Sequence, residues 1–275
     1  MPFSNEEPPA ADEYERAWEE NRPSAPVSPF ADPKVATFAV PAAFVLGWLL
    51  DHAGIGLIPL IFYHELGHGV AAWLCGLWAF PIPIAGFTFV GGKSVFVAAA
   101  VAAGLLALLR DAWRRRQGAL MAMAAVLLCL QAYLTLGLSE DRAAMWWIYA
   151  GSGGEIALPV LAIWLFYQDF PESLRWDFWR YPVLLSAACA LVYSFGFWGQ
   201  ARRDPDHRMM GESVASSRES DADWVRLVRS HGWTAQGLAD SYAALTRLGL
   251  GVVVAQHLLF VLDRRGRVRP TRAPV

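Results

Sequence analysis

The hydrophobic and polar positions divide this chain into long apolar runs separated by shorter polar segments. Seven runs approach the roughly 20 residues that an α-helix needs to cross a bilayer. They cover residues 35–50, 53–78, 94–109, 119–138, 143–167, 181–198 and 242–262. A helix satisfies its own backbone hydrogen bonds in lipid, and the runs lack the alternation of barrel strands. We therefore predict an all-α fold, a polytopic α-helical membrane bundle of about six or seven transmembrane helices.

Three polar segments accompany the predicted transmembrane domain, which spans residues 35–262. Residues 1–34 are acidic and proline-rich, which is typical of a flexible tail. Residues 200–240 form a polar insert, where Trp224, Leu227 and Val228 are spaced as in an amphipathic helix lying on the bilayer surface. Residues 263–275 are rich in arginine, which predicts a basic cytoplasmic tail.

A second basic segment sets the orientation of the predicted bundle. Arg110 and Arg114–Arg116 lie four predicted spans before the basic tail, so both segments can be cytoplasmic. Counting back over three spans places residues 1–34 outside the cell. If one of the short runs does not cross the membrane, residues 1–34 are instead cytoplasmic. Prolines and glycines between residues 80 and 92 argue against a continuous helix there. Residues 84–90 form either an extended hairpin or a plain connecting loop.

Composition agrees with a membrane protein. Hydrophobic residues make up 55% of the chain and charged residues 17%, and the net charge is −2. No basic excess points to nucleic acid as a partner, so the expected partner is the lipid bilayer. The preference for Arg over Lys and the frequent Ala are typical of a GC-rich bacterial genome, so we expect this multi-pass protein in a bacterial inner or plasma membrane. Oligomeric state does not follow from the sequence.

One motif within the second apolar run carries chemistry. His64-Glu65-Leu66-Gly67-His68 has the pattern His-Glu-x-x-His. On a helix the two histidines lie one turn apart on the same face, so both imidazoles can bind one Zn²⁺. Glu65 can then act as general base toward water. Ionisable groups in an apolar run are costly, which favours a functional site over an idle polar cluster.

A catalytic zinc site needs a third protein ligand. We predict Glu155 as this ligand. It lies midway along run 143–167, and His64 and His68 lie midway along run 53–78, so the three side chains are expected at the same depth in the membrane. The preceding Gly151-Ser152-Gly153-Gly154 would let two helix backbones approach closely. Glu155 has two other interpretations, a helix cap or an ion pair with an arginine in a polar cavity.

The remaining histidines and acidic residues are weaker candidates. His257 lies at mid-depth in the last run, where a polar packing contact is the more common role. His52 is expected at the membrane interface, and His207 and His231 are expected in solvent. Asp221 and Asp223 can approach a site from outside the membrane, but we interpret them as surface charges.

The motif and its surroundings resemble the site-2 protease family of intramembrane zinc metalloproteases. The resemblance covers residues 55–92 and rests on the His64–His68 motif, on Ala71-Ala72 and Cys75-Gly76 after it, and on a glycine-containing segment at 84–92. It implies that His64 and His68 bind zinc and that Glu65 activates water. The family's third ligand is an Asp within Leu-Asp-Gly, a motif that this chain lacks. Gly153-Gly154-Glu155 is the nearest functional substitute.

The predicted function is therefore a zinc metallopeptidase that hydrolyses peptide bonds of membrane protein or peptide substrates. One feature differs from several members of the site-2 protease family. In those proteins the hairpin after the motif is cytosolic, whereas the arginine distribution here places residues 84–92 outside. The alternative is a non-catalytic integral membrane protein with a vestigial or structural metal site, which the missing Leu-Asp-Gly motif favours. A transporter is a third possibility, although no inverted repeat of spans supports it.

Overall fold

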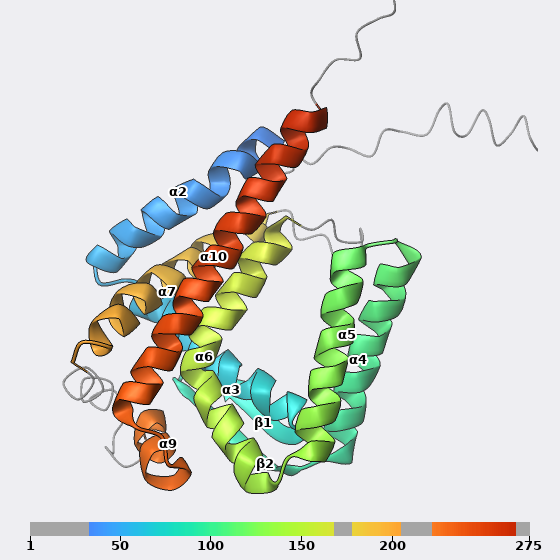
Figure 1. Cartoon of the computed structure of the whole chain (residues 1–275), viewed down its shortest axis with the longest axis vertical. Helices are drawn as coiled ribbons and strands as arrows, with labels where there is room; N and C mark the ends of the chain where they lie inside the picture. Colours follow the sequence, from blue (N-terminus) through green and yellow to red (C-terminus); the bar gives the residue numbers. More distant parts are fainter. Residues whose placement is uncertain (1–32, 168–177, 205–221, 268–275) are drawn as a thin grey trace, which may run out of the picture.

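The computed structural model describes residues 33–167, 178–204 and 222–267, so most of the predicted tails and the centre of the polar insert lie outside the described residues. Within these ranges the chain forms eight α-helices, one π-helical turn and a two-stranded sheet (Figure 1). The predicted all-α class is confirmed. The elements are α2 (Pro33–His52), α3 (Leu57–Leu74), β1 (Leu77–Ile82), β2 (Phe87–Lys93), α4 (Val95–Arg114), α5 (Gly118–Ala132) with a π-turn (Tyr133–Gly137), α6 (Glu140–Phe166), α7 (Arg180–Ala201), α9 (Asp223–His231) and α10 (Ala235–Arg267).

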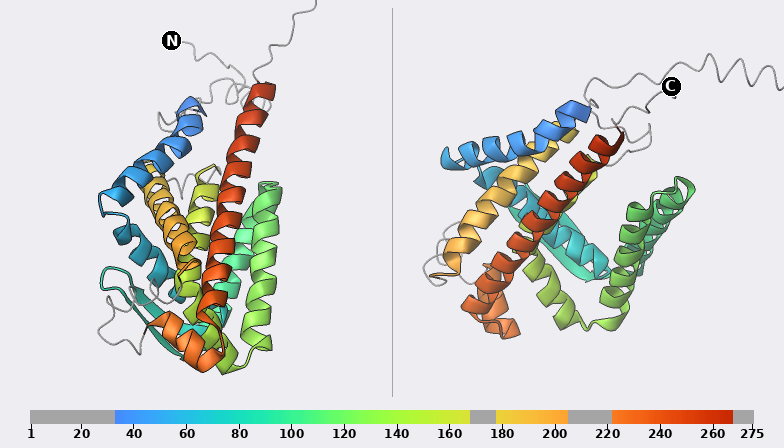
Figure 2. Two further views of the ribbon diagram at one scale, coloured as in Figure 1. Left: turned by 60° about the vertical axis from the view of Figure 1, so that its left-hand side comes forward. Right: turned by 45° about the horizontal axis from the view of Figure 1, so that its top comes forward.

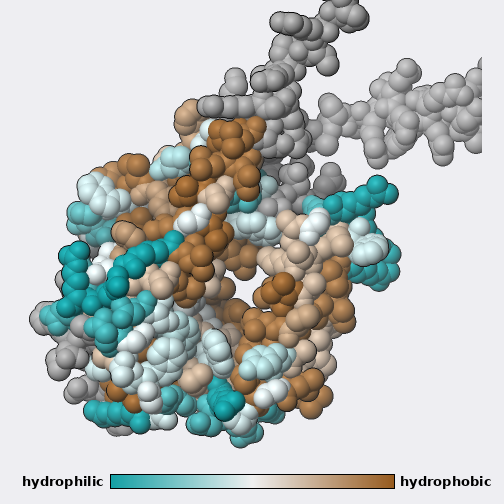
Figure 3. All heavy atoms as spheres, viewed as in Figure 1, coloured by the Kyte–Doolittle hydropathy of each residue, from teal (hydrophilic) through white to brown (hydrophobic). Residues whose placement is uncertain are grey.

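Five helices of the described residues are long and apolar enough to cross a membrane, namely α4, α5 with its π-turn, α6, α7 and α10. The pair α2–α3 adds a sixth if it counts as one broken span, because the two helices meet at an angle of 106°. By length and composition the described residues therefore allow five or six membrane crossings, where the sequence predicted about six or seven. Hydrophobic residues cover much of α10 and the α4–α5 pair, and hydrophilic residues gather toward the ends (Figure 3).

Helix α6 lies at the centre of the main bundle. It packs against α3 and α7 and also contacts α10, while α2 lies along α7 (Figures 1 and 2). Their shared core contains Ile148 and Ile156 of α6 and Leu191 and Trp198 of α7. The α4–α5 pair stands apart from this bundle and joins it through α3 and β1. Its long apolar surface is exposed, as expected of helices that face lipid.

The predicted helix over residues 53–78 is shorter in the structure. Gly54 and Gly76 take positive φ angles of 78° and 71°, which side-chain-bearing residues rarely adopt, and they lie just outside the ends of α3. The apolar residues after Gly76 continue as strand β1, which pairs antiparallel with β2. The backbone N–H of Ser94 donates to the Gly76 carbonyl at 2.8 Å and closes the base of this hairpin. Of the two alternatives for this segment, the hairpin is the one observed.

Helices α3 and α6 approach each other through glycines. A Cβ on Gly154 would collide with the backbone of Gly67 and with the Tyr63 carbonyl oxygen, and a Cβ on Gly67 would collide with the Ala150 carbonyl. The prediction that residues 151–154 allow a close helix contact is confirmed. This contact places the motif of α3 directly against α6.

We expect Gly154→Ala to lower the free energy of unfolding by about 1–3 kcal/mol, because the atoms that a methyl group meets are backbone atoms that cannot rotate away. Gly153→Ala is the matched control on the same helix, since its Cβ would make ordinary contacts with Tyr149 at 3.6 Å. Unfolding by SDS titration, followed by circular dichroism, measures both variants. Equal midpoints for the two variants would contradict the close backbone contact.

Candidate metal centre

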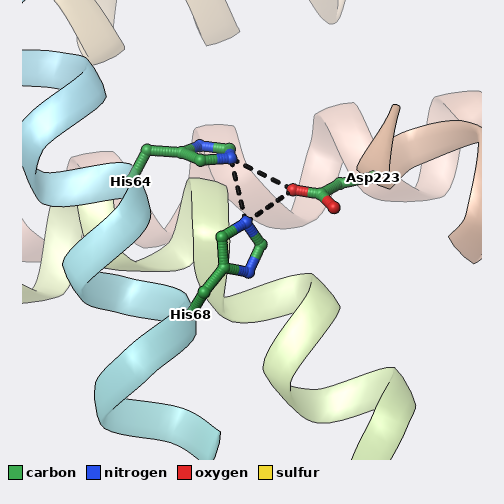
Figure 4. Close-up of side chains that lie close together, drawn as sticks. All are labelled: His64, His68 and Asp223. Carbon is green, nitrogen blue, oxygen red and sulfur yellow. Dashed lines mark hydrogen bonds and ion pairs between the residues drawn. The ribbon is translucent and has the colours of Figure 1, made fainter. Parts of the chain in front are cut away.

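The two histidines of the motif lie on one face of α3, as their spacing predicts. His64 Nε2 and His68 Nε2 are 3.1 Å apart, and both atoms point toward the same small volume (Figure 4). His68 is buried, whereas the His64 side chain keeps 23% of its surface exposed. The pair therefore offers two nitrogen atoms to one ion, with access from one side.

Asp223 provides the third converging atom. It is the first residue of α9, and its Oδ2 lies 3.0 Å from His64 Nε2 and 2.8 Å from His68 Nε2 (Figure 4). The candidate ligand atoms of these three residues all lie within 4.8 Å of one another. A zinc ion about 2 Å from each atom fits such a triangle and keeps a fourth position open for water or substrate.

The other ring nitrogens of the two histidines are engaged by hydrogen bonds. His68 Nδ1 lies 2.8 Å from the Trp147 carbonyl oxygen, an acceptor only, so Nδ1 donates its proton there, and in the neutral ring the lone pair then lies on Nε2. His64 Nδ1 lies 2.6 Å from Glu155 Oε1, and an ionised Glu155 accepts the Nδ1 proton in the same way. Such partners fix the tautomer and the ring orientation of metal-binding histidines. Both Nε2 atoms are thus prepared to bind a cation.

Glu155 is buried in α6 and contacts the site from the far side of the His64 ring. The sequence analysis predicted it as the third zinc ligand. The structure instead brings Asp223 to the two Nε2 atoms and leaves Glu155 on the Nδ1 side of His64. This position suits a carboxylate that orients a ligand and raises its basicity.

Glu65 is buried and bonded to the hairpin. Thr88 of β2 donates its hydroxyl to Glu65 Oε2 at 2.6 Å, and Thr88 Oγ1 also lies 3.0 Å from the Glu65 backbone oxygen. Glu65 neighbours His64 in the chain but does not belong to the three converging residues. The predicted general base is therefore held by a strand, apart from the predicted ligands.

Helix α9 docks on α6 and so delivers Asp223. Its apolar face, with Leu227 and Val225, is buried, and Leu227 belongs to the core of the bundle. The Arg226 guanidinium lies 4.9 Å from the centre of the Trp147 ring, a cation–π contact. The amphipathic helix of the polar insert is confirmed, but its apolar face packs on protein and not on the bilayer surface.

The electrostatics at Asp223 suit an ionised carboxylate. Burial by itself raises the pKa of the Asp223 carboxyl, but the adjacent His68 and His64 imidazoles outweigh burial and hold this pKa well below its ordinary value. Asp223 also lies in the first turn of α9, where the helix dipole favours a negative charge. Positive charge at this point, carried by imidazole protons or by a bound cation in their place, offsets the buried carboxylate.

The remaining candidates lie elsewhere. His257 of α10 has its Nδ1 2.7 Å from the Tyr167 hydroxyl, which is the polar packing contact expected of it. His52 Nδ1 lies 2.9 Å from the Trp48 carbonyl oxygen at the end of α2. The prediction that His231 faces solvent is wrong, because only 7% of its side chain is exposed and its Nδ1 lies 3.9 Å from an Asp141 carboxylate oxygen. His207 and Asp221 are outside the described residues.

Neither a protein-family model, nor a curated protein, nor a solved structure matches this chain. The site must therefore be interpreted from its own geometry. Asp223 was not predicted as a candidate ligand, because the residue lies in a polar segment, where acidic side chains are ordinary. The signal that could have found it is its place at the start of an amphipathic helix, whose apolar face requires a docking surface.

Proposed function

We propose that the protein is a membrane-embedded zinc-dependent peptidase, with His64, His68 and Asp223 as zinc ligands and Glu65 as general base. One observation carries this proposal: two histidines whose Nδ1 atoms are engaged elsewhere present their Nε2 atoms to a single carboxylate oxygen. The resemblance of residues 55–92 to site-2 proteases supports the same chemistry. Asp223 takes the ligand role that this family assigns to the Asp of Leu-Asp-Gly.

Each residue of the candidate metal centre has a defined part in this proposal. Zinc, when bound, would acidify water and polarise a peptide carbonyl. The Glu65 carboxylate would accept a proton from water and later donate it to the leaving amine. Glu155 would hold His64 in the tautomer that leaves Nε2 unprotonated. The partial exposure of His64 and Asp223, 23% and 21% of their side chains, would give water a route to the site.

The hairpin provides a place for the substrate. A helical peptide bond is poorly accessible because its carbonyl is already hydrogen-bonded, so the substrate must unwind. The described residues contain only two strands in this sheet, and each strand therefore keeps one edge for pairing with an extended chain. The Thr88 hydroxyl ties β2 to Glu65, so a peptide added along β2 would lie near the general base.

Removal and return of the metal test the proposed function. We expect the purified full-length protein in detergent micelles to contain one zinc per chain, measured by mass spectrometry of the metal. Treatment with phenanthroline should abolish cleavage of a single-span reporter peptide interrupted by glycine and proline, and added zinc should restore it. Fully helical protein that is purified without zinc and takes up none when zinc is added would contradict the proposal. Tightly held zinc without cleavage would favour the structural metal site.

A further inference from the structure

A second polar feature lies away from the metal centre, between the end of α7 and the first part of α10. It is an open pocket of about 630 Å³ that contains three arginines, Arg202, Arg203 and Arg247. Gly199 of α7 lies in its wall, and no atom comes within 4 Å of the place where a Cβ would stand. Figure 3 shows hydrophilic residues gathered beside the hydrophobic surface of α10 in this part of the molecule.

The hydrogen bonds of the pocket leave two guanidinium groups available. Arg202 Nε pairs with Asp240 Oδ1 at 2.6 Å, and Gln236 Nε2 donates to Asp240 Oδ2 at 3.2 Å. Both oxygens of the one carboxylate in the pocket are thereby occupied. Arg203 and Arg247 are exposed and have no ion pair within the part of the chain that the structure describes. Among the described residues that line it, the pocket therefore has three arginines and one carboxylate, and Asp240 interacts with Arg247 as well as with Arg202.

The position of the pocket indicates what would neutralise this charge. Arg202 and Arg203 directly follow the last residue of α7, whose apolar length suits one membrane crossing. A crossing helix leaves the hydrocarbon at the level of the lipid headgroups. Arg247 lies within the apolar stretch of α10, where a long side chain extends along apolar surface and keeps its charge in the polar layer. Planar guanidinium groups match the oxygens of a phosphate in pairs.

We propose that the pocket formed by α7 and α10 binds a phosphodiester group, as carried by the headgroup of an anionic phospholipid. The site is independent of the metal centre and of the proposed peptidase activity. Arg203 and Arg247 bind the phosphate oxygens, while Asp240 and Gln236 hold Arg202 in place beside them. The open space beside Gly199 provides room for the part of the headgroup beyond the phosphate.

Lipid titration of the full-length protein in detergent micelles, read by native mass spectrometry, tests this site. The probes are dioctanoyl phosphatidylglycerol, dioctanoyl phosphatidylcholine and glycerophosphoglycerol, which is a phosphodiester without acyl chains. We expect phosphatidylglycerol to bind, and Arg203→Gln with Arg247→Gln to weaken its binding about 100-fold, since each of the two lost charged contacts accounts for roughly tenfold. The control, Arg110→Gln with Arg114→Gln, changes two exposed arginines of α4 and should leave the affinity unchanged.

The probes separate the sources of the phosphodiester. Binding of both phosphatidylglycerol and glycerophosphoglycerol, lost together in the double variant, supports a phosphodiester site that does not need acyl chains. Binding of phosphatidylglycerol alone supports a lipid site. Equal affinity of the unmodified protein for phosphatidylcholine would overturn the proposal, and so would unchanged phosphatidylglycerol binding in the double variant. The comparison of phosphatidylglycerol with phosphatidylcholine uses the unmodified protein, so its result does not depend on whether a variant folds.

Discussion

Glu65→Gln is expected to reduce peptide cleavage by about 10²–10⁴-fold while the zinc content stays at one per chain. The substitution preserves the size of the side chain, and the amide oxygen can still accept the Thr88 hydroxyl that now bonds Glu65 Oε2. It removes only the capacity to take a proton from water. The proposed ligands His64, His68 and Asp223 are unchanged, so metal binding and chemistry separate in one variant.

Two further variants sharpen this measurement. Thr88→Val keeps the Glu65 carboxylate but removes its hydrogen-bond donor, so cleavage should fall by less than in Glu65→Gln. Glu140→Gln changes an exposed carboxylate in the first turn of α6 and should leave cleavage unchanged. Rates are measured with the reporter peptide on zinc-loaded protein. If Glu65→Gln cleaves at the normal rate, Glu65 is not the general base.

The part of the site formed by one helix could be predicted from the sequence. A spacing of four residues places His64 and His68 on one helix face whatever the rest of the fold does. Glycines at residues 151–154 similarly predict a close helix contact, because few other sequences permit backbones to touch. Both predictions are confirmed: the first depends only on helix geometry, and the second depends on the small size of the residues at the contact.

The third ligand could not be predicted in the same way. The depth argument correctly places Glu155 beside His64, since both lie midway along their apolar runs. The depth of a carboxylate in the membrane does not specify which ring nitrogen of a histidine it contacts, and Glu155 contacts Nδ1 of His64. Asp223 reaches the Nε2 side only because α9 folds back onto α6. The apolar residues of α9 are equally suited to lipid and to protein, so its docking surface does not follow from its pattern.

Hydropathy also gave no sign of where α3 begins and ends. Residues on both sides of Gly54 and Gly76 are apolar, so run 53–78 looks continuous although the chain bends before Leu57 and becomes a strand at Leu77. A glycine within an apolar run predicts only that a positive φ is possible. Whether the chain uses it depends on tertiary contacts, here the hairpin packed against α3.

Asp223→Ala is expected to weaken zinc binding by more than about 100-fold, because it removes one of the three proposed protein ligands. Glu155→Gln should weaken binding less, by about 10–100-fold, since an amide oxygen still accepts the His64 Nδ1 proton but lacks the negative charge. Affinities are measured by competition with a chromophoric zinc chelator. Asp141→Asn is the matched control, because that side chain is 83% exposed at the start of α6.

The order of these two effects decides between the ligand predicted from sequence and the ligand indicated by the structure. If Glu155 bound the metal directly, Glu155→Gln would cost at least as much affinity as Asp223→Ala. The structure gives the reverse order, because Asp223 Oδ2 lies within 3.0 Å of both Nε2 atoms whereas Glu155 Oε1 contacts His64 on its Nδ1 atom. Unchanged zinc affinity in Asp223→Ala would remove α9 from the site, and a metal centre within the membrane helices would then have to be completed by Glu155.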